Sequence, residues 1–187
     1  TAGGAITATD DQSLTDAEVN DISITSTANI VAGVINAGTT AGDVILDAQV
    51  GSITDSNGAT VNVTAQVLTA DAVGGINLDT TIASLDASTS ATGVIDIAET
   101  NANTLTDVDT ANGAVTITAG GEITATDVQS LTDAEANDIS ITSTANIVTG
   151  VIKVGANAGA VILCSQGGAI ATSKGALLKV AGQGVPA

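Results

Sequence analysis

Residues 113–124 read GAVTITAGGEIT, and this stretch indicates the fold. Val115 and Ile117 alternate with threonines, which is the period of a β-strand that buries one face. Gly120 and Gly121 then interrupt the alternation with residues that tolerate a tight corner. The stretch therefore predicts a short strand followed by a corner.

The same alternating pair of apolar residues recurs along the chain. Successive pairs are separated by 15–24 residues, about 20 on average. The pairs are Ile22/Ile24, Val44/Leu46, Val61/Val63, Ile76/Leu78, Ile95/Ile97, Val115/Ile117, Ile139/Ile141 and Val161/Leu163. A strand that returns every ~20 residues describes one coil of a β-solenoid, in which each coil hydrogen-bonds to the next. The sequence predicts an all-β fold, a parallel β-helix of roughly nine coils and about 40–45 Å in length.

A large internal duplication is superimposed on this short period. Residues 1–56 align without gaps onto residues 118–173 at an offset of 117, with 41 of 56 positions identical. The phrase DISITSTANI occurs unchanged at 21–30 and at 138–147. We interpret residues 1–187 as a single β-solenoid with duplicated modules 1–56 and 118–173, linked by solenoid coils 57–117. Duplication on this scale is typical of repeat architectures.

One other fold competes with the solenoid, and one segment allows a short helical turn. The competing fold is a tandem of β-sandwich domains, because 117 residues also suit a sandwich. The chain contains no aromatic residue, however, and a sandwich core normally uses some. The segments 13–18 and 130–135 match a helix capping box, which allows a single helical turn at a coil corner.

The composition restricts the core and the function. The chain lacks Phe, Trp, Tyr, Met, His and Arg, so its core must consist of Ile, Val, Leu and Ala. A hydrophobic content of 44% and a mean hydropathy of +0.43 argue against disorder. No apolar run reaches the ~18–20 residues of a membrane span, so no membrane insertion is expected. The chain starts at Thr1, which favours a processed product or an excised fragment.

The net charge of −17 comes from 20 acidic residues and three lysines. Such a chain has too few cations to bind nucleic acid through phosphates. An acidic surface instead keeps a repetitive β-protein soluble and discourages edge pairing. Residues 1–138 carry −20 and residues 139–187 carry +3, which predicts head-to-tail attraction between copies.

The repeats resemble the central shaft of filamentous-haemagglutinin-like exoproteins and giant bacterial surface adhesins. The similarity lies in phrases such as 113–124 and Gly42-Asp-Val-Ile-Leu-Asp47. It implies a right-handed parallel β-helix in a secreted protein of the bacterial cell surface. It implies no functional residues, because no motif corresponds to a secretion domain or a receptor-binding loop.

Catalysis has few candidate residues. Without His or Tyr no serine–histidine arrangement can form. A polysaccharide-cleaving enzyme could use paired carboxylates, for which Asp10-Asp11 and Asp107/Asp109 are the candidates. In the second copy Val128 stands where the first copy has Asp11. This difference favours the interpretation that these carboxylates are solvated residues at coil corners. We therefore expect no enzyme, no catalytic residues and no cofactor. Calcium needs only oxygen ligands, and Asn20-Asp21 and Asp107-Val-Asp109 could supply them, although the known calcium-loop spacings are absent.

Three further features have simple explanations. The T-x-T phrases 7–9, 25–27, 116–118, 124–126 and 142–144 are similar to ice-binding arrays, but threonine is also a common residue of exposed strands. Cys164 lies in the apolar run 160–164 and is expected to be a small core residue. Asn62-Val-Thr64 matches a glycosylation sequon, which we attribute to chance.

The sequence thus predicts a structural or adhesive segment of a secreted bacterial surface protein, whose partner is a second copy of itself or a host or cell-surface ligand. The alternatives are a monomeric carbohydrate- or ice-binding solenoid and, last, a polysaccharide-cleaving enzyme.

Overall fold

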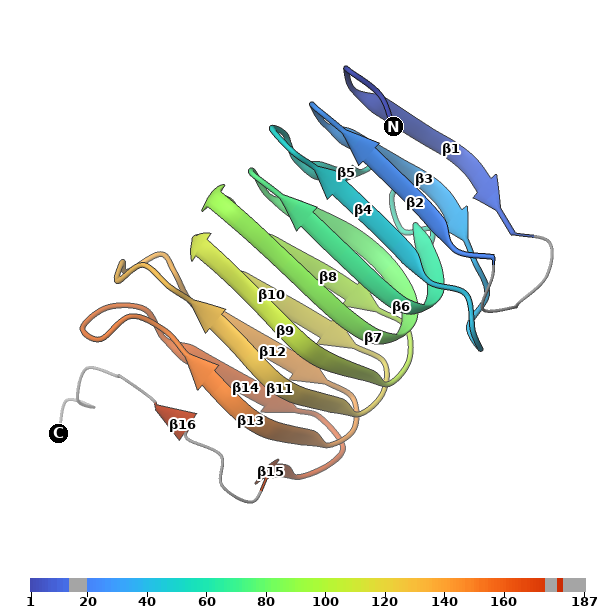
Figure 1. Cartoon of the computed structure of the whole chain (residues 1–187). Helices are drawn as coiled ribbons and strands as arrows, with labels where there is room; N and C mark the ends of the chain where they lie inside the picture. Colours follow the sequence, from blue (N-terminus) through green and yellow to red (C-terminus); the bar gives the residue numbers. More distant parts are fainter. Residues whose placement is uncertain (14–19, 174–177, 180–187) are drawn as a thin grey trace, which may run out of the picture.

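The chain forms a parallel β-solenoid (Figure 1). The computed structural model describes residues 1–13, 20–173 and 178–179. All strand pairings in this part of the chain are parallel, and they join 16 strands into one continuous sheet. The described residues contain no helix. The predicted fold class is therefore confirmed, and the alternative of two antiparallel sandwiches is wrong.

The sheet wraps around the core as two ladders of stacked strands. Ladder 1 contains β1 (Ile6–Gln12), β3 (Ile30–Asn36), β5 (Ile53–Asp55), the start of β7 (Ile76–Thr92), β8 (Ile95–Glu99), β10 (Val115–Ala119), β12 (Ile139–Ser143) and β14 (Val161–Ser165). Ladder 2 contains β2 (Ile22–Ser26), β4 (Val44–Ala48), most of β6 (Val63–Ala72), the rest of β7, β9 (Asn103–Asn112), β11 (Ile123–Ser130), β13 (Ile147–Lys153), β15 (Ile170–Thr172) and β16 (Leu178–Lys179).

Seven turns separate the first and last strands of ladder 1. Val161 follows Ile6 by 155 residues over these turns, about 22 residues per turn. Strand spacing of ~4.8 Å gives a stack about 34 Å tall. The predicted number of coils, nine, was too high, and the predicted length of about 40–45 Å was too long. The prediction used a period of ~20 residues per coil and counted every residue of the chain.

In-register stacking of inward side chains explains why these residues form the solenoid. In ladder 1, Ile30, Ile53, Ile76 and Ile95 lie one above another and are at most 1% exposed. Alternate residues point outward, so each strand needs only one apolar face. The buried hydrophobic residues make one continuous core of aliphatic side chains.

Each turn contains two strands, one in each ladder, and this corrects the predicted series of pairs. The pairs Ile22/Ile24 and Val44/Leu46 belong to ladder 2, whereas Ile76/Leu78 and all later pairs belong to ladder 1. The partners that continue Val44 and Leu46 are Leu68 and Ala70, not Val61 and Val63. The 32 residues from Val44 to Ile76 therefore cover one and a half turns.

The duplicated modules consequently lie on opposite ladders. β1 and β3 belong to ladder 1, whereas their copies β11 and β13 belong to ladder 2. Among the long connections that the structure describes in full, 37–43 of the first module runs from ladder 1 to ladder 2. In the second module, 131–138 and 154–160 run from ladder 2 to ladder 1. Figure 1 shows the described loops of the two modules on opposite sides of the stack.

The corners between the strands are held by hydroxyl groups and glycines. The hydroxyl of Ser26 donates to the Gly4 carbonyl at 2.8 Å, and Ser143 repeats this bond to Gly121 at 2.7 Å. Gly113 packs so closely on the Gly93 carbonyl that a Cβ atom would collide with it. The segment 130–135 leads into a simple turn in which the Asn137 amide donates to Ala134, and residues 14–19 of the first copy lie outside the described part.

Candidate functional site

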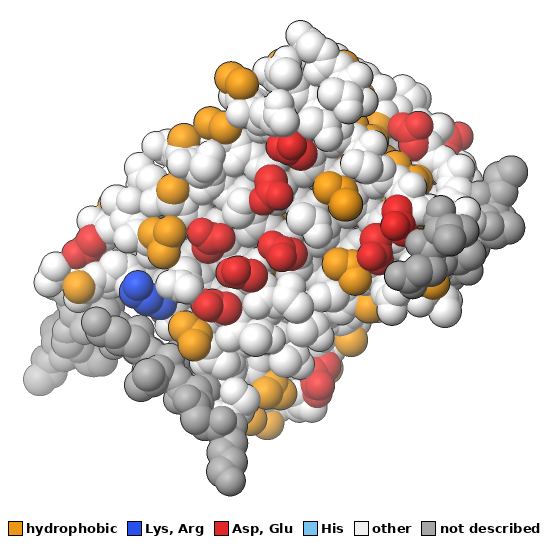
Figure 2. All heavy atoms as spheres, in the orientation of Figure 1, with side chains coloured by type: hydrophobic (Ala, Val, Ile, Leu, Met, Phe, Trp, Pro, Cys, Tyr) orange, Lys and Arg blue, Asp and Glu red, His pale blue; other side chains and the backbone are white. Residues whose placement is uncertain are grey.

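The most distinctive surface is a group of six carboxylates on the outside of ladder 2, which we name the acidic face. It consists of Asp47, Asp71, Asp86, Asp107, Asp109 and Asp127. Figure 2 shows acidic side chains gathered in the middle of this side of the molecule. Asp47 pairs with Asp71, and Asp86 pairs with Asp107, so like charges stand on adjacent strands about 4.8 Å apart.

Partial burial and crowded charge raise the pKa values of two carboxylates on this face. Partial burial raises the pKa of Asp109, and the neighbouring carboxylates, Asp107 first, raise it further. The pKa of Asp86 is raised by burial and then by Asp107 and Asp71. Some of the charge is offset by hydrogen bonds, such as the one from the Ser88 hydroxyl to Asp71 at 2.6 Å. The face repels anions and can attract cations.

The two predicted carboxylate pairs lie apart in the structure. Asp107 and Asp109 flank buried Val108 on β9, so both point outward on ladder 2. Asp10 and Asp11 lie at the end of β1 in ladder 1, where both are exposed. Neither pair lies among the residues of the hollow described below. In the described part of the chain, no three acidic or thiol side chains are grouped to hold a metal ion.

The predicted ligand Asp21 has a structural role. Its carboxylate accepts a hydrogen bond from the backbone amide of Asp43 in the next coil, at 3.1 Å. The duplicated residue Asp138 accepts the same bond from Ala160 at 2.6 Å. These bonds tie each long connection to the equivalent connection in the next coil. Calcium coordination at Asn20-Asp21 remains a prediction.

The T-x-T phrases do not form one array. Those at 7–9 and 116–118 lie on ladder 1, whereas the phrase at 124–126 lies on ladder 2. In the remaining two phrases, only Thr25 and Thr142 lie in strands, one on each ladder, and their second threonines lie in corners. The only two of these phrases that stack directly are the neighbours on β10 and β12.

Cys164 is exposed, so the prediction of a core cysteine was wrong. In the run 160–164 every residue is apolar, but alternation turns Val161 and Leu163 inward and leaves Ile162 and Cys164 outside.

Asn62 is fully buried, and its side-chain amide contacts carbonyl groups of Ala32 and Gly33. A buried amide cannot carry a glycan, which agrees with a chance sequon.

A buried carboxylate was missed from the sequence. Glu99 is 5% exposed and takes the inward corner position that Thr80 and Ala119 hold in adjacent coils. It accepts hydrogen bonds from the Thr80 hydroxyl at 2.7 Å and from the amides of Ile82 and Asn101 at 3.1 and 3.0 Å. Burial raises its pKa, although these bonds oppose the shift. Continuing the alternation of Ile95 and Ile97 by one step would have predicted it.

Beside Glu99, the side-chain amide of Asn103 donates to the carboxylate at 3.4 Å. The carbonyl oxygen of Asn103 is buried without a hydrogen-bond partner. The pair adds a carboxylate and an amide to the buried polar side chains of the solenoid. It is enclosed within the solenoid, so it can affect stability more readily than it can meet a substrate.

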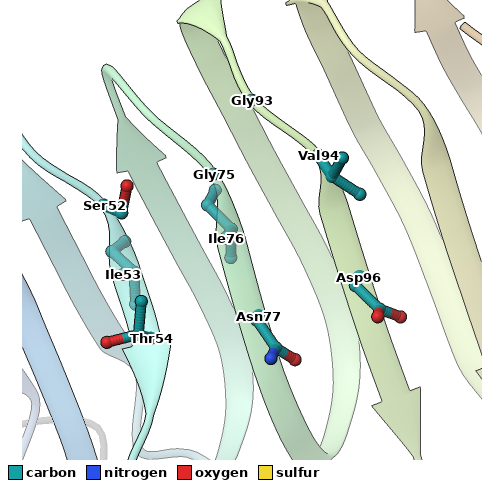
Figure 3. Close-up of a pocket in the computed structure, with 9 residues that line it drawn as sticks. All are labelled: Ser52, Ile53, Thr54, Gly75, Ile76, Asn77, Gly93, Val94 and Asp96. Carbon is teal, nitrogen blue, oxygen red and sulfur yellow. The ribbon is translucent and has the colours of Figure 1, made fainter. Parts of the chain in front are cut away.

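A shallow hollow of about 310 Å³ lies on the outside of ladder 1. Its residues are Ser52, Ile53, Thr54, Gly75, Ile76, Asn77, Gly93, Val94 and Asp96. Figure 3 shows Thr54, Asn77 and Asp96 on three neighbouring strands, where they make a short polar row beside Val94. The row can offer hydrogen bonds to an extended ligand, but no aromatic side chain is available in the chain to stack a sugar ring.

No family model, curated protein or solved structure matches this chain. The fold itself defines the class, a parallel β-solenoid repeat protein. The described residues include no helix that is long and apolar enough to cross a membrane.

Proposed function

We propose that the chain is a rigid structural segment, the shaft of a secreted bacterial surface protein or filament, and that it does not act as an enzyme. The observation that carries this proposal is the unbroken stack of inward side chains over seven turns, which joins both modules into one core. Each coil contacts mainly its neighbours along the axis, an arrangement suited to length and stiffness.

The outer surface supports the same role. The acidic face adds like charge to a chain of net charge −17 and opposes lateral association of sheets. The resemblance of the repeats to adhesin shafts supports secretion to a bacterial surface. Adhesion to a host or cell-surface ligand would use exposed outer rows, such as Thr54–Asn77–Asp96 in the hollow.

Rigidity can be tested with spin labels on the outer row of ladder 1. In this row Thr7 and Ser140 are separated by six coil steps, about 29 Å at ~4.8 Å per step. We expect the T7C/S140C chain, with Cys164 replaced by serine, to give one narrow distance distribution near that value. A broad distribution would contradict a rigid shaft.

The alternative of a carbohydrate-active protein is tested on the same preparation. The chain is incubated with a panel of polysaccharides, and co-sedimentation and newly formed reducing ends are measured. We expect neither. Cleavage that is lost in D107N/D109N, but kept in a D79N control on ladder 1, would replace the structural proposal with an enzymatic one. Saturable binding without cleavage would replace it with a carbohydrate-binding one.

A further inference from the structure

Both ends of the solenoid expose core positions. The inward aliphatic residues that remain only partly buried are Ile6 and Ile22 at one end and Val161 and Leu163 at the other. Ile170, in the last coil, is 48% exposed. The isoleucines that stack in register with Ile6 in the middle coils, Ile30, Ile53, Ile76 and Ile95, are at most 1% exposed. In the described part of the chain, each end of the solenoid therefore presents apolar residues of the core.

Both end strands of ladder 1 also have a free edge within the described part of the chain. There β1 pairs only with β3, and β14 pairs only with β12. Natural edge strands are usually protected by charges, proline or a bulge. β14 has none of these, since it reads Val-Ile-Leu-Cys-Ser and Ile162 is 50% exposed. The edge is suited to accept another strand.

We infer that β14 of one chain pairs in parallel with β1 of a second copy, so that ladder 1 continues from chain to chain. This inference rests on the proposed structural role and specifies its partner. Continuing the register of the ladder places Val161 beside Ile6 and Leu163 beside Ala8 in the shared core. Outside, Cys164 extends the row Thr118–Thr142–Cys164 and stands beside Thr9 of the second copy.

The charges at the two ends fit this arrangement. β1 ends with exposed Asp10 and Asp11, and in the continued register these lie beside uncharged Ser165 and Gln166. The last acidic residue of the sequence is Asp138, so β14 and β15 carry no negative charge. The duplication explains the contrast, because Asp43, Asp47 and Asp55 of the first module are replaced by Ala160, Cys164 and Thr172 in the second. The last described coils therefore lack three carboxylates that the first module has.

Cys164 is the chain's single cysteine, which allows a direct test. Directly paired residues on neighbouring strands lie about 4.8 Å apart, within the Cα range of a disulfide. We expect the T9C chain, under mild oxidation, to form a ladder of dimers and longer oligomers on non-reducing gels. T7C, whose partner position is Ile162, is the matched control and should cross-link at least tenfold more slowly. T9C/C164S should not cross-link.

Equal cross-linking of T9C and T7C would overturn the inference, as would monomers only. Products that stop at the dimer and form equally in the unmodified chain would indicate Cys164–Cys164 pairing and would also overturn it. The spin-label distance within one chain tests the rigid shaft independently, so the two proposals can fail separately.

A second pair of variants tests the same interface without a new cysteine, in case that cysteine disturbs folding. Leu163→Asp places a charge in the shared core, and Ile162→Asp places the same charge outside. We expect L163D to remain a monomer with an unchanged circular dichroism spectrum and I162D to keep self-association, both measured by sedimentation velocity. Association of both variants to the same extent would exclude this interface.

Discussion

Replacing Leu85 by alanine should destabilise the whole solenoid. Leu85 is fully buried on β7 and is stacked between Leu68 and Leu105 in ladder 2. Removing its outer carbons loses about 2 kcal/mol of burial free energy at ~0.8 kcal/mol per carbon. The strands on both sides are hydrogen-bonded and cannot close the gap, so the cavity adds about 1 kcal/mol. We therefore expect the free energy of unfolding to fall by about 3 kcal/mol.

The assay is urea unfolding followed by far-ultraviolet circular dichroism. With an m-value of about 2 kcal/mol per molar urea, the midpoint should fall by about 1.5 M. Leu163→Ala is the matched control, because Leu163 has the same inward orientation but is only partly buried in the last coil. At a protein concentration low enough to keep the chain monomeric, this variant should cost about 1 kcal/mol or less. Equal losses at the two positions would refute the argument that the core is continuous in the middle and open at the end.

Three further perturbations test the corners, the buried carboxylate and the acidic face. Gly113→Ala should destabilise the chain by about 1–3 kcal/mol in the same urea assay, because the new Cβ collides with the Gly93 carbonyl, whereas Gly3→Ala meets no atom and should have little effect. The pKa of Glu99 is raised in the folded chain, so between its unfolded and folded pKa values the folded chain binds more protons than the unfolded chain. The contribution of Glu99 to stability therefore falls as pH rises through that window. Melting temperatures measured against pH should show this fall, and Glu99→Gln should reduce it. Asp109→Asn should raise the melting temperature by relieving repulsion on the acidic face, and the gain should shrink at high salt.

Each of these three has an outcome that contradicts its reasoning. Equal stability of the two glycine variants would mean that the corner is looser than the contact with Gly93 implies. An unchanged pH profile in E99Q would assign the acid dependence to Asp79, Asp86 and Asp109, whose pKa values are also raised by burial and neighbouring charge. A loss of stability in D109N would show that its carboxylate is used in a favourable contact.

The solenoid could be predicted because its signal is repeated. Each strand needs only two or three inward aliphatic residues, and pairs such as Ile95/Ile97 and Ile139/Ile141 recur with corners between them. The ladder of each strand was not predictable in the same way. Strands of both ladders have the same alternation, so nothing in Val61/Val63 shows that the series changes ladder there.

The change of ladder is coupled to an irregular coil. Residues 56–62 bulge between β5 and β6, and buried Asn62 anchors this bulge through Asp55 and Asn57 at 2.8 Å each. Burial alone would raise the pKa of Asp55, but hydrogen bonds from the Asn57 amide and the Asn62 side chain hold that pKa below its ordinary value. Such a polar cluster depends on contacts between distant residues, which alternation does not encode.

The candidate sites were predictable only in part. Asp107 and Asp109 were recognised as a pair. The acidic face also needs Asp47, Asp71, Asp86 and Asp127, which are brought together only after the coils stack. A uniform apolar run hid the outward orientation of Cys164, because every residue in it could have been buried.

The most direct test of the coil architecture is a methyl NOE experiment on the chain labelled at Ile, Leu and Val. The solenoid predicts contacts between consecutive residues of the ladder Ile6, Ile30, Ile53, Ile76, Ile95, Val115, Ile139 and Val161. The contact between Ile53 and Ile76 is decisive, because it joins the first module to the coils that follow. An unbroken path from Ile6 to Val161 would support the account. A path that stops after Ile53, with no contact to Ile76, would contradict it.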